Sequence, residues 1–128
     1  MKIKNIHHVA IICSDYQRSK DFYTNGLGFT IKAEYYRSAR DSYKLDLEIN
    51  GLYQIELFSF PNSPERPSYP EAKGLRHLAL AVENIEETLS ELRSKGIQTE
   101  EIRIDECTGK RFVFFKDPDG LPLELYEE

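Results

Sequence analysis

The sequence predicts an α+β fold made of two tandem modules, each with the element order βαβββ. Two histidine-led apolar segments recur, at His8–Ile12 and His77–Ala81. Two glutamate-centred segments also recur, at residues 54–58 and 122–126. The histidines stand 69 positions apart and the glutamates 68. Two recurrences at nearly one separation indicate a duplicated structural unit.

The first module is predicted to span residues 1–60 and to begin with a strand at 6–13. A helix follows over Tyr16–Asn25, capped by Ser14 or Asp15 and ended by Gly26. Three strands complete this module, at 29–36, 43–50 and 52–60. The turn between the last two strands is Asn50-Gly51, which is typical of a β-hairpin.

The second module is predicted to span residues 74–128, after a linker at 61–73. Proline at every third position between 61 and 70 favours an extended, semi-rigid linker. A strand at 75–82 leads to a helix over Ile85–Lys95, capped by Asn84 and ended by Gly96. The remaining strands are expected at 97–104, 111–116 and 121–126.

Composition excludes several function classes. The net charge of −5 and the sequence pI of about 5.3 argue against nucleic acid, which is bound mainly through clustered Lys and Arg. No apolar run approaches the roughly 20 residues that span a bilayer. The N-terminus shows no signal segment, so we expect a cytoplasmic protein. Two cysteines without Cys-x-x-Cys spacing exclude a thiolate zinc site.

Strand alternation predicts one metal site. In all four strands, the bulky apolar residues face opposite the histidine or glutamate. In the strand of Glu56, for example, Gln54 shares its face and Tyr53 lies on the other. Two buried carboxylates close together are costly unless a cation neutralises them. The predicted ligands of one divalent cation are His8, Glu56, His77 and Glu124. His7 falls on the apolar face and is interpreted as a core or rim histidine.

Several motifs then support a resemblance. They are His8 with Asp15, Phe22-Tyr23, Leu27-Gly28-Phe29, the segment 74–79, and Asp117-Pro118-Asp119-Gly120 followed by Glu124. With the paired modules, they resemble the vicinal oxygen chelate superfamily, and most closely glyoxalase I and its small bacterial relatives. The resemblance implies one domain over 1–128 with a glyoxalase/bleomycin-resistance/dihydroxybiphenyl dioxygenase-like fold. It also implies a homodimer that binds a small molecule.

Two imidazoles and two carboxylates suit Ni²⁺, Co²⁺, Mn²⁺ or Zn²⁺. By resemblance, we expect a lyase or isomerase of glyoxalase type, working through an enediolate, with Glu124 or Glu56 as the base. Two alternatives stay open. One is a non-catalytic binding or resistance protein of the same fold, and the other is an Fe(II) extradiol-type dioxygenase.

The substrate is less defined by the sequence. The polar segment 35–41 contains Arg37 and Arg40, which are able to hold a carboxylate or phosphate. Solvated loop charges explain the same two residues equally well. The phenylalanines of the strands are able to line a pocket or to pack in the core, and the two interpretations are equally good.

Overall fold

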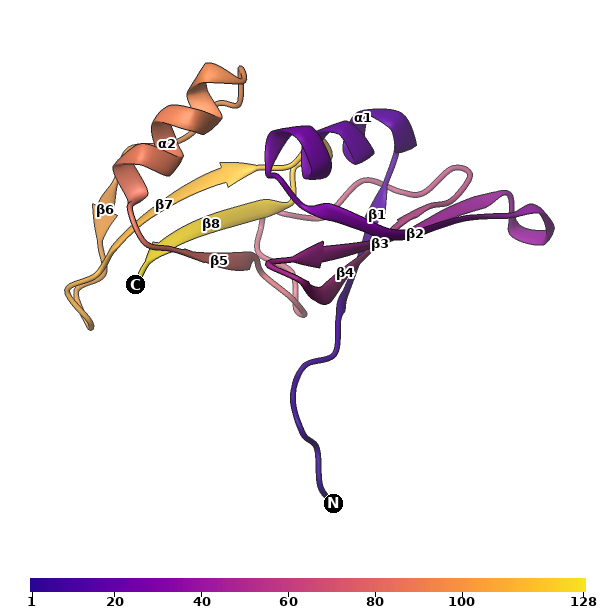
Figure 1. Cartoon of the computed structure of the whole chain (residues 1–128), viewed down its shortest axis with the longest axis horizontal. Helices are drawn as coiled ribbons and strands as arrows, with labels where there is room; N and C mark the ends of the chain where they lie inside the picture. Colours follow the sequence, from indigo (N-terminus) through magenta and orange to yellow (C-terminus); the bar gives the residue numbers. More distant parts are fainter. The chain divides into compact units, whose positions relative to one another are not determined.

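The computed structural model describes all 128 residues, which form two compact units, Met1–Pro64 and Glu65–Glu128. Each unit is a four-stranded mixed sheet that carries one α-helix on one face (Figure 1). Neither helix has the length and apolar character needed to span a lipid bilayer. The expected α+β fold of two βαβββ modules is therefore confirmed.

Unit 1 begins with strand β1 (Val9–Cys13) and helix α1 (Tyr16–Asp21), which continues as a π-helical turn over Phe22–Gly26. Strands β2 (Thr30–Arg37), β3 (Ser42–Ile49) and β4 (Leu52–Ser59) follow. The strand order is β1-β4-β3-β2, with β1 parallel to β4 and the other pairs antiparallel. The predicted cap is present, because Asp15 Oδ1 accepts a hydrogen bond from the backbone N–H of Arg18 at 3.1 Å.

Unit 2 repeats this topology with β5 (Leu78–Val82), α2 (Ile85–Ser94), β6 (Arg103–Ile104), β7 (Arg111–Lys116) and β8 (Pro122–Glu127). Its strand order is β5-β8-β7-β6, and β5 is parallel to β8. Asn84 caps α2 by accepting from the backbone N–H of Glu87 at 3.1 Å.

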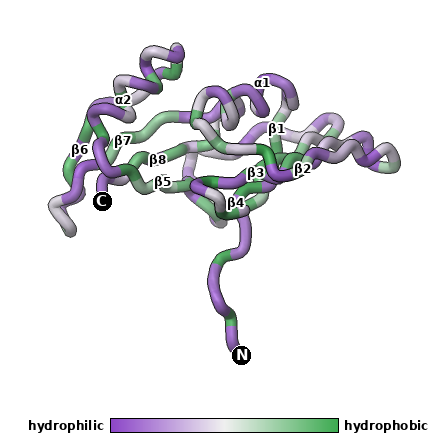
Figure 2. The backbone as a smooth tube through the Cα atoms, in the orientation of Figure 1, coloured by the Kyte–Doolittle hydropathy of each residue, from purple (hydrophilic) through white to green (hydrophobic).

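The core of each unit lies between its sheet and its helix. In unit 1, Leu45, Leu47 and Leu57 are fully buried, and in unit 2 Ile85, Val113 and Leu123 are. Burying each such side chain stabilises the fold by about 1.5–3 kcal/mol relative to exposure. Figure 2 shows the matching pattern along the chain, with hydrophobic residues concentrated on strands such as β7 and β8.

Four elements differ from the sequence-based prediction. The first helix ends its α-helical part at Asp21, and the π-helical turn takes over up to Gly26. The strand expected at 97–104 shrinks to Arg103–Ile104, with one isolated bridge from Thr99 to Phe115. The first strand of each unit starts later than expected, at Val9 and Leu78, because the parallel partners β4 and β8 first pair there.

Candidate metal centre

Each unit brings one predicted histidine into contact with one predicted glutamate. His8 Nε2 lies 3.5 Å from Glu56 Oε2, and His77 Nε2 lies 2.9 Å from Glu124 Oε2. Both contacts follow from the parallel register, in which Ala10 is opposite Glu56 and Ala79 is opposite Glu124. Each histidine stands two residues before that alanine and therefore on the same face. The duplicated sequence thus builds the same two-residue contact twice.

The two carboxylates are nearly buried, whereas the imidazoles are accessible. Glu56 and Glu124 are 9% and 8% exposed. The side chains of His8 and His77 are 36% and 34% exposed. A carboxylate removed from water needs a hydrogen bond or a cation to compensate for its lost hydration. The opposite face of the same strands is the apolar core, so these polar residues lie on the face away from the helices.

Glu56 has a dense set of polar neighbours. The Tyr53 hydroxyl donates a hydrogen bond to Glu56 Oε2. Lys44 Nζ lies 3.6 Å from Glu56 Oε2 and 2.5 Å from Asp46 Oδ1. Asp46 is only 5% exposed and is paired with Glu56 across β3 and β4. Unit 1 therefore surrounds its glutamate with a phenol, an ammonium group and a second carboxylate.

These neighbours also change one another's ionisation. Burial raises the pKa of Tyr53, and its hydrogen bond to Glu56 raises it further. Partial burial of Lys44 works to lower its pKa, but the bond to Asp46 and the charge of Glu56 outweigh burial and raise the pKa. Tyr53 is thus held as a neutral donor and Lys44 as a cation, and both lie close to the Glu56 carboxylate.

The position of Tyr53 corrects the strand alternation predicted from the sequence. Leu47 pairs with Ile55, but the next residue, Glu48, pairs with Tyr53, so Gln54 is an extra, bulged residue. A β-bulge shifts the alternation by one position. Tyr53 therefore shares the face of Glu56, whereas the prediction placed Gln54 there and Tyr53 opposite.

His7 is not a core residue. It is exposed, and its Nδ1 atom lies 2.8 Å from Nδ1 of His8. Its ring centroid is 5.4 Å from that of Tyr53. His7 precedes Val9, the first residue of β1 that pairs with β4, so its backbone is not held in the sheet. The core interpretation of His7 is therefore wrong, and its ring contacts the candidate ligand His8.

Glu124 has much simpler surroundings. His77 is the only basic side chain within 4.0 Å of it. The residue paired with Glu124 across β7 and β8 is Phe114, whose ring meets that of His77 edge to face at 5.1 Å. Arg103 covers Phe112 and Phe114 on the same side, at 5.0 and 5.4 Å from their ring centroids. Unit 2 therefore places its pair against aromatic rings.

The four predicted ligands carry the types of donor atom that bind divalent cations. The structure brings the four predicted ligands together as two pairs, and no group of three or more His, Cys, Asp or Glu side chains suited to a metal forms. Each pair offers one imidazole nitrogen and one carboxylate, and together they form the nitrogen and oxygen donor set of first-row divalent metals. The convergence of all four on one cation stays a prediction.

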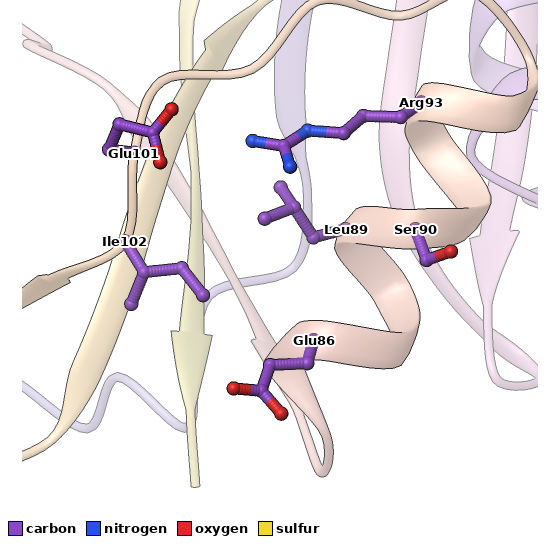
Figure 3. A pocket seen from close by; sticks show the side chains of 6 residues that line it. All are labelled: Glu86, Leu89, Ser90, Arg93, Glu101 and Ile102. Atoms are coloured by element: carbon purple, nitrogen blue, oxygen red, sulfur yellow. The ribbon is translucent and has the colours of Figure 1, made fainter.

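The pocket of unit 2 is a separate feature. A surface hollow of about 390 Å³ lies between α2 and the segment before β6 (Figure 3). Its lining is Glu86, Leu89, Ser90, Arg93, Glu101 and Ile102. Arg93 is already bonded to Thr99 at 3.0 Å, and Glu86 to Arg111 at 3.1 Å. None of the four candidate ligands lines this hollow.

Lys44, Asp46 and Tyr53 were not identified from the sequence as part of the site. A signal for two of them exists, because Lys44 and Asp46 alternate with the buried Leu45 and Leu47 and so must face the side of Glu56. No such signal exists for Tyr53, since its direction depends on the bulge at Gln54.

The duplicated βαβββ unit and its two histidine–glutamate pairs can be compared with known protein families. The chain belongs to the Glyoxalase/Bleomycin resistance protein/Dioxygenase superfamily, whose sequence model matches residues 5–125. This confirms the resemblance to the vicinal oxygen chelate proteins. Members of this superfamily generally use divalent metal ions, bind small molecules and often form dimers.

Some relatives match this chain over nearly its whole length. The chain is 62% identical to the uncharacterized protein YwkD of Bacillus subtilis over 128 residues, which is the full length of both. A glyoxalase family protein from Enterococcus faecalis matches with a TM-score of 0.91 and 52% identity, covering 99% of this chain and 100% of the other.

Two enzymes are more distant relatives. Lactoylglutathione lyase of Salmonella typhimurium is 29% identical over 124 residues, covering 94% of this chain and 90% of the enzyme. The 2-epi-5-epi-valiolone epimerase of an Actinomyces species is 26% identical over 141 residues. The match covers 94% of this chain and 77% of the epimerase.

Proposed function

We propose that this protein is a metal-dependent lyase or isomerase of glyoxalase type. Its substrate is a small molecule with two neighbouring oxygens, such as the hemithioacetal of a 2-oxoaldehyde and a thiol. The observation that carries the proposal is the repeated contact of one histidine with one nearly buried glutamate, at 3.5 Å in unit 1 and 2.9 Å in unit 2. The names of the distant relatives, a lyase and an epimerase, favour the same class.

The proposed metal ligands are His8, Glu56, His77 and Glu124. Two imidazoles and two carboxylates favour Ni²⁺, Co²⁺, Mn²⁺ or Zn²⁺ over the harder cations Mg²⁺ and Ca²⁺. When bound, such a cation polarises a carbonyl and stabilises negative charge that develops on adjacent oxygens. We further propose that the protein works as a homodimer, in keeping with the assemblies common in this superfamily.

The two glutamates have different proposed roles. Glu56 is fixed by the Tyr53 hydroxyl and is close to Lys44, so it stays in place as a ligand. Glu124 has His77 as its one basic neighbour and aromatic rings beside it, so its carboxylate is freer to exchange partners. We assign Glu124 as the base that takes the proton from the carbon next to the carbonyl.

The same carboxyl group then returns the proton to the former carbonyl carbon, and the substrate's hydroxyl proton passes to the former carbonyl oxygen. The hydrogen moves within one substrate molecule, so isomerisation needs no oxidant or reductant. His77 Nε2 lies 2.9 Å from the Glu124 carboxylate, so the proposed ligand and the proposed base are neighbours.

Metal content and turnover, measured together, test the proposal. Purified wild-type protein is expected to bind one of the four metals in stoichiometric amount and to consume the methylglyoxal–thiol adduct. His8→Ala and Glu124→Gln are expected to lower metal content and turnover. Glu83→Gln, at an exposed position outside both pairs, is the matched control and should keep both. Equal metal content in all four proteins would contradict the ligand assignment.

The same experiment separates the other functions open to this fold. A non-catalytic binding or resistance protein would consume no adduct, and its ligand binding would survive loss of the metal. An Fe(II) oxygenase would take up oxygen with a catechol, and Glu56→Gln would leave that uptake largely intact. Either result would contradict the assignment of a lyase or isomerase.

A further inference from the structure

Beyond Glu56, the same face of unit 1 carries a pair of stacked phenylalanines. Phe58 follows Glu56 by two residues in β4, so it stands about 7 Å further along the strand on the same side. The rings of Phe58 and Phe60 are stacked, with centroids 5.8 Å apart and planes 12° apart. Together they form an aromatic platform beside the histidine–glutamate pair.

A guanidinium group lies on this platform. The Cζ atom of Arg37 is 4.9 Å from the ring centroid of Phe58 and 5.6 Å from that of Phe60. Arg37 Nη2 donates to Oγ of the fully buried Ser42 at 2.8 Å. Arg40 lies over Phe60 as well, at 5.1 Å. The stacking and the serine fix the plane of the Arg37 guanidinium, which orients its remaining donors.

Both arginines lack an anionic partner. No carboxylate of the chain lies within 4.0 Å of Arg37 or Arg40. The Nε atom of Arg37 is buried and has no hydrogen-bond acceptor. A buried donor without an acceptor is unfavourable, and native proteins rarely leave one unsatisfied. An oxyanion that reaches Nε would satisfy it and would meet a fixed, planar set of donors.

We propose that Arg37, assisted by Arg40, binds a carboxylate or phosphate group of the substrate. The binding of an oxyanion stands on the geometry of unit 1, whereas its role in turnover rests on the proposed function. The substrate is accordingly a small acid whose oxyanion lies about 7 Å or more from the oxygens near Glu56. This placement makes Arg37 a specificity-determining residue.

Other cations of the chain are already engaged or less well held. Lys44 is bound to Asp46, and Arg111 is paired with both Glu127 and Glu86. Arg103 also lies over two phenylalanines, but it is exposed and makes no side-chain hydrogen bond that fixes its plane. Arg37 therefore combines stacking, a buried serine and an unused donor in one side chain.

Direct titration of the full chain tests the binding step. The probes are inorganic phosphate and, in a separate arm, acetate, and the readout is the arginine Nε–Hε region of the proton–nitrogen NMR spectrum. The Arg37 signal is assigned by its absence in Arg37→Gln. It is expected to shift and saturate with at least one probe, and the tighter probe identifies the class of oxyanion. Arg18→Gln, at an exposed helical position, should leave the shift unchanged. An Arg37 signal that does not shift, or that shifts without saturating, overturns the proposal.

Turnover tests the specificity step. Methylglyoxal adducts of 3-mercaptopropionate and of 2-mercaptoethanol differ in whether they carry a carboxylate. The ratio of their kcat/KM values, acid over neutral, is expected to fall roughly tenfold to hundredfold in Arg37→Gln, as for loss of a charge-assisted hydrogen bond. Arg37→Lys keeps the positive charge but lacks the planar set of donors, so its ratio should lie between those of the wild type and Arg37→Gln. Such an intermediate ratio separates a loss of recognition from misfolding. Arg18→Gln should keep the wild-type ratio.

The two proposals fail in different ways. If the wild-type protein consumes neither adduct, the proposed function fails, and the titration alone decides whether Arg37 binds an oxyanion. If both adducts are consumed and Arg37→Gln keeps the wild-type ratio, the specificity role of Arg37 is overturned. A fall of the ratio in Arg103→Gln with none in Arg37→Gln overturns it as well.

Discussion

The two histidine–glutamate pairs occupy equivalent strand positions but have different surroundings. In unit 1, the residue across from Glu56 is Asp46, with Lys44 and the Tyr53 hydroxyl close by. In unit 2, the residue across from Glu124 is Phe114, and the only basic partner is His77. The repeat thus supplies the same pair of donors twice. The pair of unit 1 has charged and polar neighbours, and the pair of unit 2 has aromatic neighbours.

The different surroundings are the reason for proposing different roles for the two equivalent glutamates. In both units the parallel register places the glutamate opposite an alanine that follows the histidine by two residues, and the same pair forms twice. Most of the neighbours come from β3 and β7, whose sequences differ, and Tyr53 comes from β4. Glu56 is held in place by several polar neighbours, whereas Glu124 has one basic neighbour and is freer to change its contacts. The asymmetry is therefore the physical basis for assigning Glu124 as the base.

The largest expected effect separates the two glutamates directly. Glu124→Gln is expected to lower kcat by roughly 10²–10⁴-fold, because it removes the group that transfers the proton. Glu56→Gln is expected to act mainly by lowering metal content, and its kcat per bound metal should fall less. Steady-state kinetics with metal analysis on the same samples measures both. An equal loss of kcat per bound metal would show that the surroundings do not distinguish the two residues.

The cores of the two units are expected to contribute similarly to stability. Leu57 and Leu125 each follow a candidate glutamate and face the helix side, and they are 0% and 2% exposed. Leu57→Ala and Leu125→Ala are each expected to lower the free energy of unfolding by about 2–5 kcal/mol, because each leaves a cavity under a helix. Urea denaturation measures both. A cost below about 1 kcal/mol for either variant would contradict a well-packed core in that unit.

A smaller effect should follow from the polar neighbours of Glu56. Tyr53→Phe keeps the ring but removes the hydroxyl that donates to Glu56. Loss of such a supporting hydrogen bond is expected to weaken metal binding by roughly 10–100-fold. Competition with a chromogenic chelator measures the affinity. The control is Tyr36→Phe, because the Tyr36 hydroxyl donates to Asp41 at 2.6 Å in an exposed position. If both variants bind metal as the wild type does, the hydroxyl of Tyr53 has no supporting role.

The sequence predicted the repeated parts of the molecule well. The separations of His8 from His77 and of Glu56 from Glu124 predicted the duplication, and alternation predicted that each pair shares a face. These features are local, since they depend on period-2 patterning and on one parallel register per unit. The caps Asp15 and Asn84 were predicted for the same reason.

The features that sequence reasoning missed depend on irregular backbone. The bulge at Gln54 turns Tyr53 to the side of Glu56, and no residue type in the segment announces it. His7 was misplaced because the strand begins only at Val9. The contact of Arg37 with Phe58 joins β2 to β4, which are separated by β3 in the sheet. Such a contact depends on tertiary structure. Patterns within one element predict that element, whereas contacts between elements require the structure.

The helix caps offer a finer comparison of the units. Asp15 caps the six-residue α1, and Asn84 caps the ten-residue α2, each through one hydrogen bond of 3.1 Å to a backbone N–H. Asp15→Ala and Asn84→Ala are each expected to cost about 1 kcal/mol of unfolding free energy. Thermal denaturation of matched samples measures the difference. Replacement by Ser keeps an acceptor and should restore most of the loss, and absence of that rescue would contradict a capping role.

The smallest expected effect concerns an ion pair found in unit 1. Lys20 Nζ lies 2.7 Å from Glu34 Oε2, and the Tyr16 hydroxyl also donates to this carboxylate. The bond from Lys20, and then that from Tyr16, hold the pKa of Glu34 below its ordinary value of 4.5, although burial opposes them. A lowered folded-state pKa stabilises the protein above the ordinary pKa, and this contribution is lost as the pH falls through the folded value.

Glu34→Gln should therefore destabilise the protein at neutral pH, by less than about 1 kcal/mol because the pair is partly exposed. The difference from the wild type is expected to shrink as the pH drops below 4.5 and to vanish below the folded pKa of Glu34. Urea denaturation of both proteins across this range measures the trend. A difference that grows on acidification would mean that the carboxylate is destabilising where it lies, and that the polar contacts of unit 1 do not favour its charged form.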